Sequence, residues 1–182
     1  MLTVDIDTRG VQRHLNHLLQ GIKHRQPLMQ ALAGDMWSAV EENFKQQGRP
    51  TWAGWSPAYA ARRGPGQILQ RKGRLAASIV SVADNQMARV GTNVKYAAIH
   101  QFGGTINMPA RSQRAYYRQR KDGTIGNRFV HKSRSNYSEW HTLPAYNIEI
   151  PARPFLQLTD EDISTLEETA QHYLQGVIDG NR

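Results

Sequence analysis

The amino-acid sequence predicts an α+β fold, in which amphipathic helices pack on a small, mostly antiparallel β-sheet. Two successive helical patterns lie near the start of the chain, at residues 11–22 and 28–44. A β-hairpin pattern follows at residues 78–90, and a capped amphipathic helix begins after Thr159. The 182 residues are enough for one domain, residues 1–182, with a single substantial core.

The first elements in chain order are a strand and two helices. Apolar residues alternate with polar ones at positions 2–6, which predicts a half-buried strand. The helical stripe that starts at Val11 should end near residues 24–25. Pro27 stands where a second helix would begin, and Gly48 helps to end that helix.

Two tryptophans mark the next segment. Trp52 and Trp55 flank a short loop, and Ser56 followed by Pro57 predicts the start of a short helix. Tryptophans this close usually anchor a loop onto the core, because each indole buries a large area. The alternative is that one of them faces a partner protein.

The chain is organised around residues 90–106, where a strand-like run and a turn lead into an apolar and aromatic block. The block ends on Gly103 and Gly104, which allow a positive φ or a close approach to another surface. A basic insertion then covers about residues 108–144. A strand at 146–150 and a rigid, proline-fixed segment at 151–156 follow, and the last helix should end at Gly180.

Composition excludes several classes of protein. There is no cysteine, so disulfides, thiolate nucleophiles and cysteine metal sites are absent. The start of the chain lacks signal-peptide features, and no apolar run approaches the ~20 residues that span a membrane, so we expect a soluble protein made in the cytoplasm.

The net charge of +8 is concentrated in one window. Residues 111–134 carry +7, which leaves about +1 for the remaining 158 residues. The basic residues in this window are Arg111, Arg114, Arg118, Arg120, Lys121, Arg128, Lys132 and Arg134. Interleaved tyrosines and a phenylalanine would suit a surface that follows phosphates and stacks bases. The alternative is a solvated or partner-docked loop whose charges meet an acidic neighbour.

No catalytic motif, cofactor fingerprint or metal-ligand pattern is present. His14 and His17 share a helix face but have no further ligand nearby in the sequence, so an ordinary surface pair is expected. His100 is the most notable titratable residue, and as a general base it would need an orienting acid such as Asp84 or Asp122. A histidine bonded into a structural turn is the favoured interpretation, and we expect neither enzymatic activity nor a cofactor.

Four motifs together resemble the phage virion morphogenesis family. They are the Trp52-x-x-Trp55-x-Pro57 pattern, a segment at 68–81, the run YAAIHQFGG at 96–104, and IPARPFL at 150–156. The resemblance covers about residues 28–178, and the two last motifs are specific as a pair. The insertion is long for the simpler members of the family.

The resemblance implies a non-enzymatic part of a tailed-phage or prophage particle. Such proteins are expected at the head-proximal end of the tail or in the neck, as homo-oligomeric rings with an expected sixfold symmetry that contact tail tube, sheath or connector subunits. Assembly would take place in the bacterial cytoplasm, away from membranes. Fold and ring-interface determinants would be Trp52, Trp55, Tyr96, His100, Gln101, Phe102, Gly103, Gly104, Arg153 and Phe155. The alternative is a DNA-binding module that uses the basic window, or an arm that meets DNA in the channel.

Overall fold

A computed structural model describes residues 9–179 of the chain. It divides the chain into two compact units. We call the first the body, which is Met1–Gly103 together with Pro151–Arg182, and the second the arm, which is Gly104–Ile150. The arm begins and ends a few residues outside the insertion expected at 108–144. The single-domain description stays a prediction.

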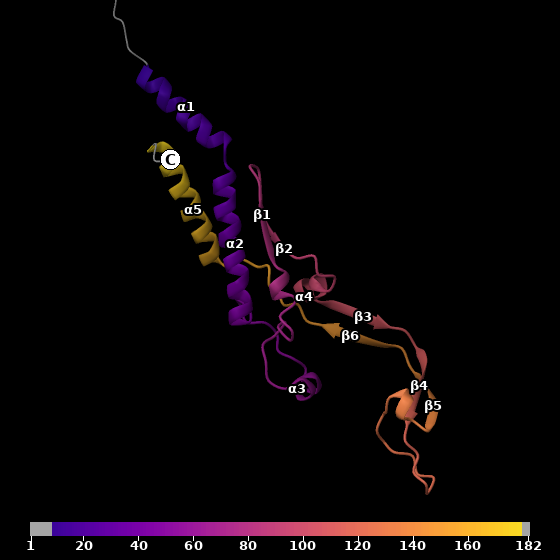
Figure 1. The fold of residues 1–182 in the computed structure, drawn as a ribbon. Helices are drawn as coiled ribbons and strands as arrows, with labels where there is room; N and C mark the ends of the chain where they lie inside the picture. The colour runs from indigo at the N-terminus through magenta and orange to yellow at the C-terminus, as the bar shows by residue number, and fades with distance from the viewer. Residues whose placement is uncertain (1–8, 180–182) are drawn as a thin grey trace, which may run out of the picture. The chain divides into compact units, whose positions relative to one another are not determined.

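Within the described residues, the body contains five α-helices, drawn in Figure 1. Their bounds are α1 (Arg9–Lys23), α2 (Gln26–Gln46), α3 (Pro57–Arg63), α4 (Ala97–Phe102) and α5 (Asp160–Ile178). The expected α+β class is confirmed, and so are the two N-terminal helices, the short helix after Ser56 and the capped final helix. The predicted strand at positions 2–6 and the predicted stop at Gly180 lie outside the described residues.

Local chemistry explains where the helices begin and end. The Ser56 side chain caps α3 by accepting a hydrogen bond from the backbone N–H of Tyr59. Thr159 and Asp162 form a reciprocal capping box at the start of α5, where the positive end of the helix dipole also stabilises acidic side chains. The helix α2 ends at Gln47, which has a left-handed φ of 59°.

The body has one β-hairpin, formed by β1 (Val80–Ala83) and β2 (Ala88–Gly91) in antiparallel register. Asp84 holds its turn because its carboxylate accepts the backbone N–H groups of Gln86 and Met87. The hairpin packs on α2 (Figure 1). The hairpin predicted at residues 78–90 is therefore confirmed.

The core of the body lies between α2, the hairpin and the segment before α5. Phe44 contacts Trp52 edge-on, with ring centroids 5.7 Å apart, and Phe155 at 5.5 Å. The buried cluster consists of Val40, Phe44, Trp52, Leu75, Ile79, Ala97 and Phe155. The C-terminal helix packs against α2, and the end of α1 packs against α5.

The arm consists of two separate antiparallel ladders. One pairs β3 (Gly104–Met108) with β6 (Tyr146–Ile150), and the other pairs β4 (Arg111–Tyr117) with β5 (Tyr137–Leu143). The strand at 146–150 was predicted, whereas the other three strands of the arm were not. The antiparallel pairing that the sequence predicts is present, but as three two-stranded ladders in the described chain rather than one sheet.

None of the helices within residues 9–179 combines the length and apolar character that crossing a membrane would require.

Candidate functional site

Three of the sequence motifs meet at one junction in the body, centred on Arg153. Its Nε donates to the carbonyl oxygen of Ala53 at 2.8 Å, and its Nη2 donates to that of Gly54 at 2.8 Å. Its backbone N–H donates to the carbonyl oxygen of His100 at 2.7 Å. Arg153 is only 7% exposed, and its guanidinium binds the tryptophan loop while its backbone N–H binds α4, so this one residue ties both to the segment 151–156.

Side-chain amides satisfy the backbone of the segment at 151–156, which has no strand partner. The Oε1 atom of Gln101 accepts the N–H groups of Phe155 and Leu156, both at 3.0 Å. The Nδ2 group of Asn43 donates to the carbonyl oxygens of Phe155 and Gln157 at 3.0 and 2.7 Å. Because a buried peptide group without a partner is costly, these two amides fix the course of the chain before α5.

The two tryptophans have different surroundings. Trp52 is buried, and its Nε1 donates to the carbonyl oxygen of Pro154 at 3.2 Å, which confirms the loop-anchor interpretation. Trp55 is half-buried, with the guanidinium of Arg63 4.5 Å from its ring centroid and Tyr59 edge-on at 5.8 Å. Trp52 therefore serves the fold, while Trp55 keeps an accessible edge.

The apolar block ends in an exposed aromatic. Phe102, the last residue of α4, is 79% exposed, and Tyr96 before the helix is 40% exposed. Gly103 follows with a φ of 69°, which a side chain would strain, and Gly104 begins β3 with a φ of 146°. Buried hydrogen bonds hold the junction around Arg153 together, so the backbone that carries Phe102 is fixed in position. The sequence predicts these residues as interface determinants, and this stays a prediction.

His100 faces the tyrosine of its own motif rather than a catalytic acid. Its ring lies edge-on to Tyr96 at 5.7 Å, and its Nδ1 is buried without a hydrogen-bond partner in the described part of the chain. Burial lowers the pKa of His100, and the nearby positive charge of Arg153 lowers that pKa further. Asp84, one of the acids considered as an orienting partner, instead holds the hairpin turn.

Arg49 and Asp162 form a buried ion pair that sequence reasoning missed. Both guanidinium Nη atoms reach the carboxylate, at 3.0 and 2.8 Å, and the two side chains are only 14% and 12% exposed. Arg49 also donates to Asn43 Oδ1 and to the carbonyl oxygen of Ala39, both at 2.9 Å. This pair joins the end of α2 to the capping box of α5. The two residues are far apart in sequence, so no local pattern signals their contact.

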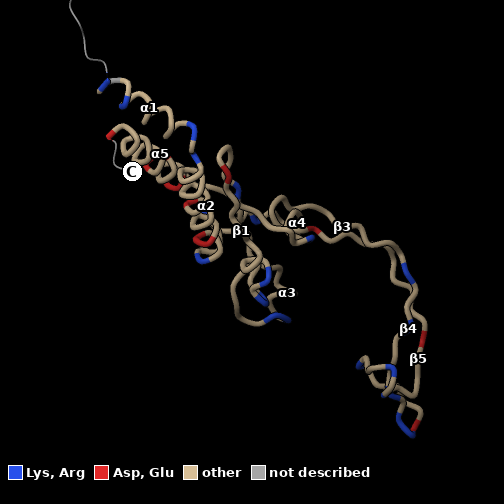
Figure 2. The backbone as a smooth tube through the Cα atoms, turned by 45° about the horizontal axis from the view of Figure 1, so that its top comes forward, with Lys and Arg blue, Asp and Glu red and all other residues tan. Residues whose placement is uncertain are grey.

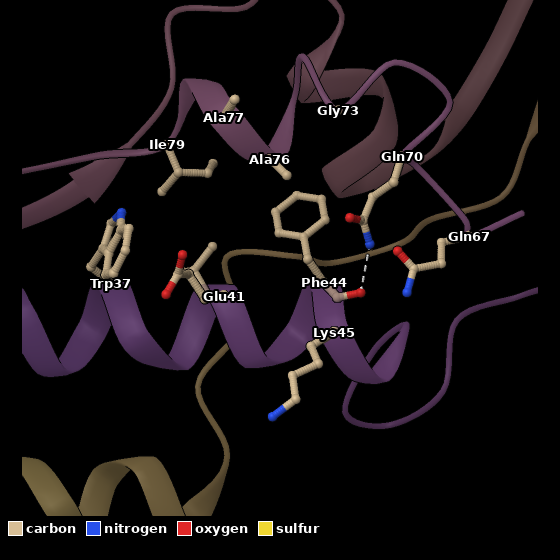
Figure 3. Close-up of a pocket in the computed structure, with 11 residues that line it drawn as sticks. Trp37, Glu41, Phe44, Lys45, Gln67, Gln70, Gly73, Ala76, Ala77 and Ile79 are labelled. Atoms are coloured by element: carbon tan, nitrogen blue, oxygen red, sulfur yellow. Dashed lines mark hydrogen bonds between the residues drawn. The ribbon is translucent and has the colours of Figure 1, made fainter.

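A groove of about 520 Å³ lies along α2 (Figure 3). Its lining is mostly apolar or amide, with Trp37, Phe44 and Ile79 among the apolar residues, and Gln70 donates to the carbonyl oxygen of Phe44 at 2.8 Å. Glu41 is the one carboxylate in this lining. Most glycosidases use a pair of carboxylates, whereas this lining supplies one. Within residues 9–179, no three metal-ligating side chains gather closely enough to hold an ion.

The arm carries the second candidate surface, a set of exposed cations. All eight basic residues predicted as contacts are exposed, and in Figure 2 the blue segments of the arm lie in its β4–β5 part. Among the described residues, none of the eight forms an ion pair. The guanidinium of Arg114 stacks 5.4 Å from the ring centroid of Trp140, which is 64% exposed. Trp140 was not among the predicted contact residues.

Comparisons with known proteins place the whole chain in context. The model of the phage virion morphogenesis family matches residues 6–175. The chain is similar to the Mu-like prophage FluMu G protein 2 of Haemophilus influenzae, with 35% identity over 98% of this chain and 99% of that protein. It is also similar to the putative capsid assembly protein G of Escherichia phage Mu, with 34% identity over 60% of this chain and 76% of that protein. No solved structure matches the chain.

Proposed function

The chain belongs to the phage virion morphogenesis family, and from this premise we propose that it forms a ring at the head-proximal end of the tail. The ring, of about six copies, would complete the tail and allow the head to join it. In this role the protein is non-enzymatic and acts through its surfaces. It would contact tail tube, sheath or connector subunits and remain in the virion.

The exposed apolar surface of the body is the observation that most supports a ring. Leu15, Leu19 and Ile22 fall on one face of α1, and each is more than half exposed. Phe102, the last residue of α4, adds an exposed aromatic side chain. Single exposed apolar residues are ordinary, but a helical stripe of them indicates a surface that another protein covers. In a symmetric particle, other copies of the same chain are the simplest proteins to cover this stripe.

The names of the relatives support a role in particle assembly. The phage Mu relative is named as a putative capsid assembly protein. A part that joins the head to the tail would affect the yield of complete particles, and so would a part of the head itself. The two roles differ in which structure is left unfinished when the protein is absent.

The test is electron microscopy of lysates from a phage or prophage that lacks this gene, complemented with the wild type or with Phe102→Ser. We expect full heads and separate tails without complementation, and far fewer joined particles with the Phe102 variant than with the wild type. Circular dichroism of the purified variant controls for folding. Malformed or missing heads beside normally completed tails would contradict the tail position and favour a role in the capsid.

DNA binding by the arm is a second candidate function, favoured by its eight exposed cations and by the stacked pair of Arg114 and Trp140. Such a surface would hold DNA mainly through phosphate contacts, so binding should weaken steeply as salt rises. The measurement is DNA retention between about 50 and 200 mM salt, over which six or more phosphate contacts predict a loss of at least ~10³ in affinity. A slope near zero would remove this candidate.

A further inference from the structure

We propose that the arm of one copy docks on the outer face of α5 of a neighbouring copy. The contact would use the face of β4 and β5 that carries Arg114 and Trp140, and the stripe of α5 that carries Ile163, Glu167 and Leu174. The inference rests on the proposed ring, and it specifies which surfaces meet within it.

The β4–β5 ladder has one covered face and one open face. Arg114 lies directly opposite Trp140, and Ser112 lies opposite Thr142, so these four side chains share a face. The opposite face carries Tyr117, which contacts Phe129 at 5.4 Å and hydrogen-bonds to His141 at 3.0 Å. The open face thus presents an exposed tryptophan beside an arginine, a pair of residue types typical of the centre of a protein interface.

The outer face of α5 is apolar and acidic. Ile163, Glu167, Leu174 and Ile178 follow helical spacing and form one stripe, and the three apolar members are each close to half exposed. The neighbouring face of α5 packs within the body, where Thr169 donates to Asp35 at 2.7 Å and Val177, at the border of the stripe, is buried. The stripe itself is left about half exposed in the described chain.

The charges of α5 and of the arm are opposite. The helix contains five acids and no lysine or arginine. Asp162 is paired with Arg49, while the side chains of the other four acids form no hydrogen bond or ion pair within residues 9–179. These four are Asp160, Glu161, Glu167 and Glu168, and all are exposed. The arm contains eight Lys and Arg against three acids, so both surfaces hold charge that the described monomer leaves uncompensated.

The dimensions and the symmetry fit a contact between copies. The seven-residue strands of β4 and β5 span about 23 Å, and the 19 residues of α5 span about 28 Å, so the ladder can lie along the helix. Each copy offers one arm and one α5. A head-to-tail contact of this kind uses both surfaces of every copy when a ring closes. It also separates the basic arms by acidic helices. DNA would satisfy the arginines but would not cover the apolar stripe of α5.

The first test is site-specific photo-crosslinking in the full-length protein. A benzophenone amino acid replaces Trp140, and copies labelled with ¹⁴N and ¹⁵N are mixed before irradiation. We expect crosslinks from position 140 to peptides within residues 160–178, each of which joins a ¹⁴N-labelled copy to a ¹⁵N-labelled copy. The matched control replaces Gln113, which lies on the opposite face of the same ladder, and should give no crosslink to α5.

The second test reverses the charges of the proposed contact. Arg114→Glu and Glu167→Arg should each lower the association constant, measured by native mass spectrometry, by about tenfold or more. The double variant should recover most of the loss, which a general effect on folding would not allow. Equal losses that add in the double variant would overturn the pairing of these two residues.

The outcomes separate this inference from the ring itself. Rings whose crosslinks map away from α5 would overturn the contact and leave the ring standing. Crosslinks confined to single chains would show that the arm folds onto its own body, and crosslinks to added DNA with none to α5 would assign the open face to nucleic acid. A protein that neither assembles nor crosslinks between copies would contradict both proposals.

Discussion

At the scale of single residues, buried polar side chains determine how the loops of the body are held. Arg153 joins two loops to α4, Gln101 and Asn43 satisfy the backbone before α5, and Arg49 links α2 to α5. Each of these side chains binds groups that would otherwise lose water without gaining a partner. The junction should therefore respond sharply to the loss of one partner.

Asp162→Asn is expected to destabilise the body by about 3 kcal/mol, because it leaves the Arg49 guanidinium without its carboxylate in a mostly buried site. Burial acts to raise the pKa of Asp162, but the Thr159 N–H and the Arg49 pair outweigh it and hold that pKa below its usual value. The matched control is Glu42→Gln, which removes the more exposed ion pair with Lys45 and should cost much less stability, because solvent screens this pair. Urea unfolding measures both, and equal losses would contradict the account.

His100 should make stability depend on pH on the acidic side. Its pKa in the folded protein is below the ordinary value near 6.5, so the unfolded chain binds more protons as pH falls below about 6.5. Stability is therefore complete above that pH and declines below it. His100→Gln should flatten the part of this decline that begins near pH 6.5, as measured by urea unfolding from pH 7.5 to 5. An unchanged slope would show that other groups cause it.

Several residues of the junction could be predicted from the sequence. Trp52, Gln101, Arg153 and Phe155 lie in motifs with aromatic, proline or glycine neighbours, and the structure brings them together. Asn43 could not be predicted, because on a helix it is indistinguishable from a solvated polar residue. Its partners lie more than 110 positions away, and only the folded chain shows that it is buried.

At the scale of elements, the contact between α1 and α5 depends on a glycine. Gly21 faces the buried Val177, and Tyr173 donates from its hydroxyl to the carbonyl oxygens of Gly21 and His24 at 3.1 and 3.0 Å. The absence of a side chain at Gly21 lets the two helices approach closely. The apolar stripe of α1 is therefore held at a defined place on the body.

Gly21→Ala should weaken this contact, because the added Cβ would collide with the Val177 side chain. We expect a loss of about 1–3 kcal/mol, together with faster amide hydrogen exchange in α1. Gly10→Ala, in the same helix, has open space around the added Cβ and should be neutral or stabilising by up to about 1 kcal/mol. If the two variants exchange alike, the close approach does not position α1.

The elements differ in how well the sequence predicts them. The helices α1, α2, α3 and α5 and the body hairpin have clear periodicity or capping residues, so their positions follow from local patterns. The helix α4 was not predicted, because it has only six residues and no side-chain cap. The strands β4 and β5 lack such patterns, because polar and charged residues occupy both faces of their largely exposed ladder, and β3 is a short segment with only two apolar side chains. Pairing between Arg111–Tyr117 and Tyr137–Leu143 depends on partners 20 to 32 positions apart, which composition does not reveal.

At the scale of the whole molecule, the chain combines a body of net charge +3 with an arm of net charge +5, and family membership assigns it to phage particle assembly. The sequence motifs predicted the family, and the structure explains most of them as a buried junction. Four surfaces stay exposed: Phe102, the apolar stripe of α1, the outer face of α5 and the open face of the arm. We infer that other proteins cover these surfaces in the assembled particle.

The mass of the purified full-length protein, measured by native mass spectrometry alone and with tail tubes from the same phage, tests the central claim most directly. The proposed function predicts a closed ring of about six subunits, or a monomer that becomes such a ring on tube ends. A protein that stays monomeric and leaves the tubes unbound would contradict the ring.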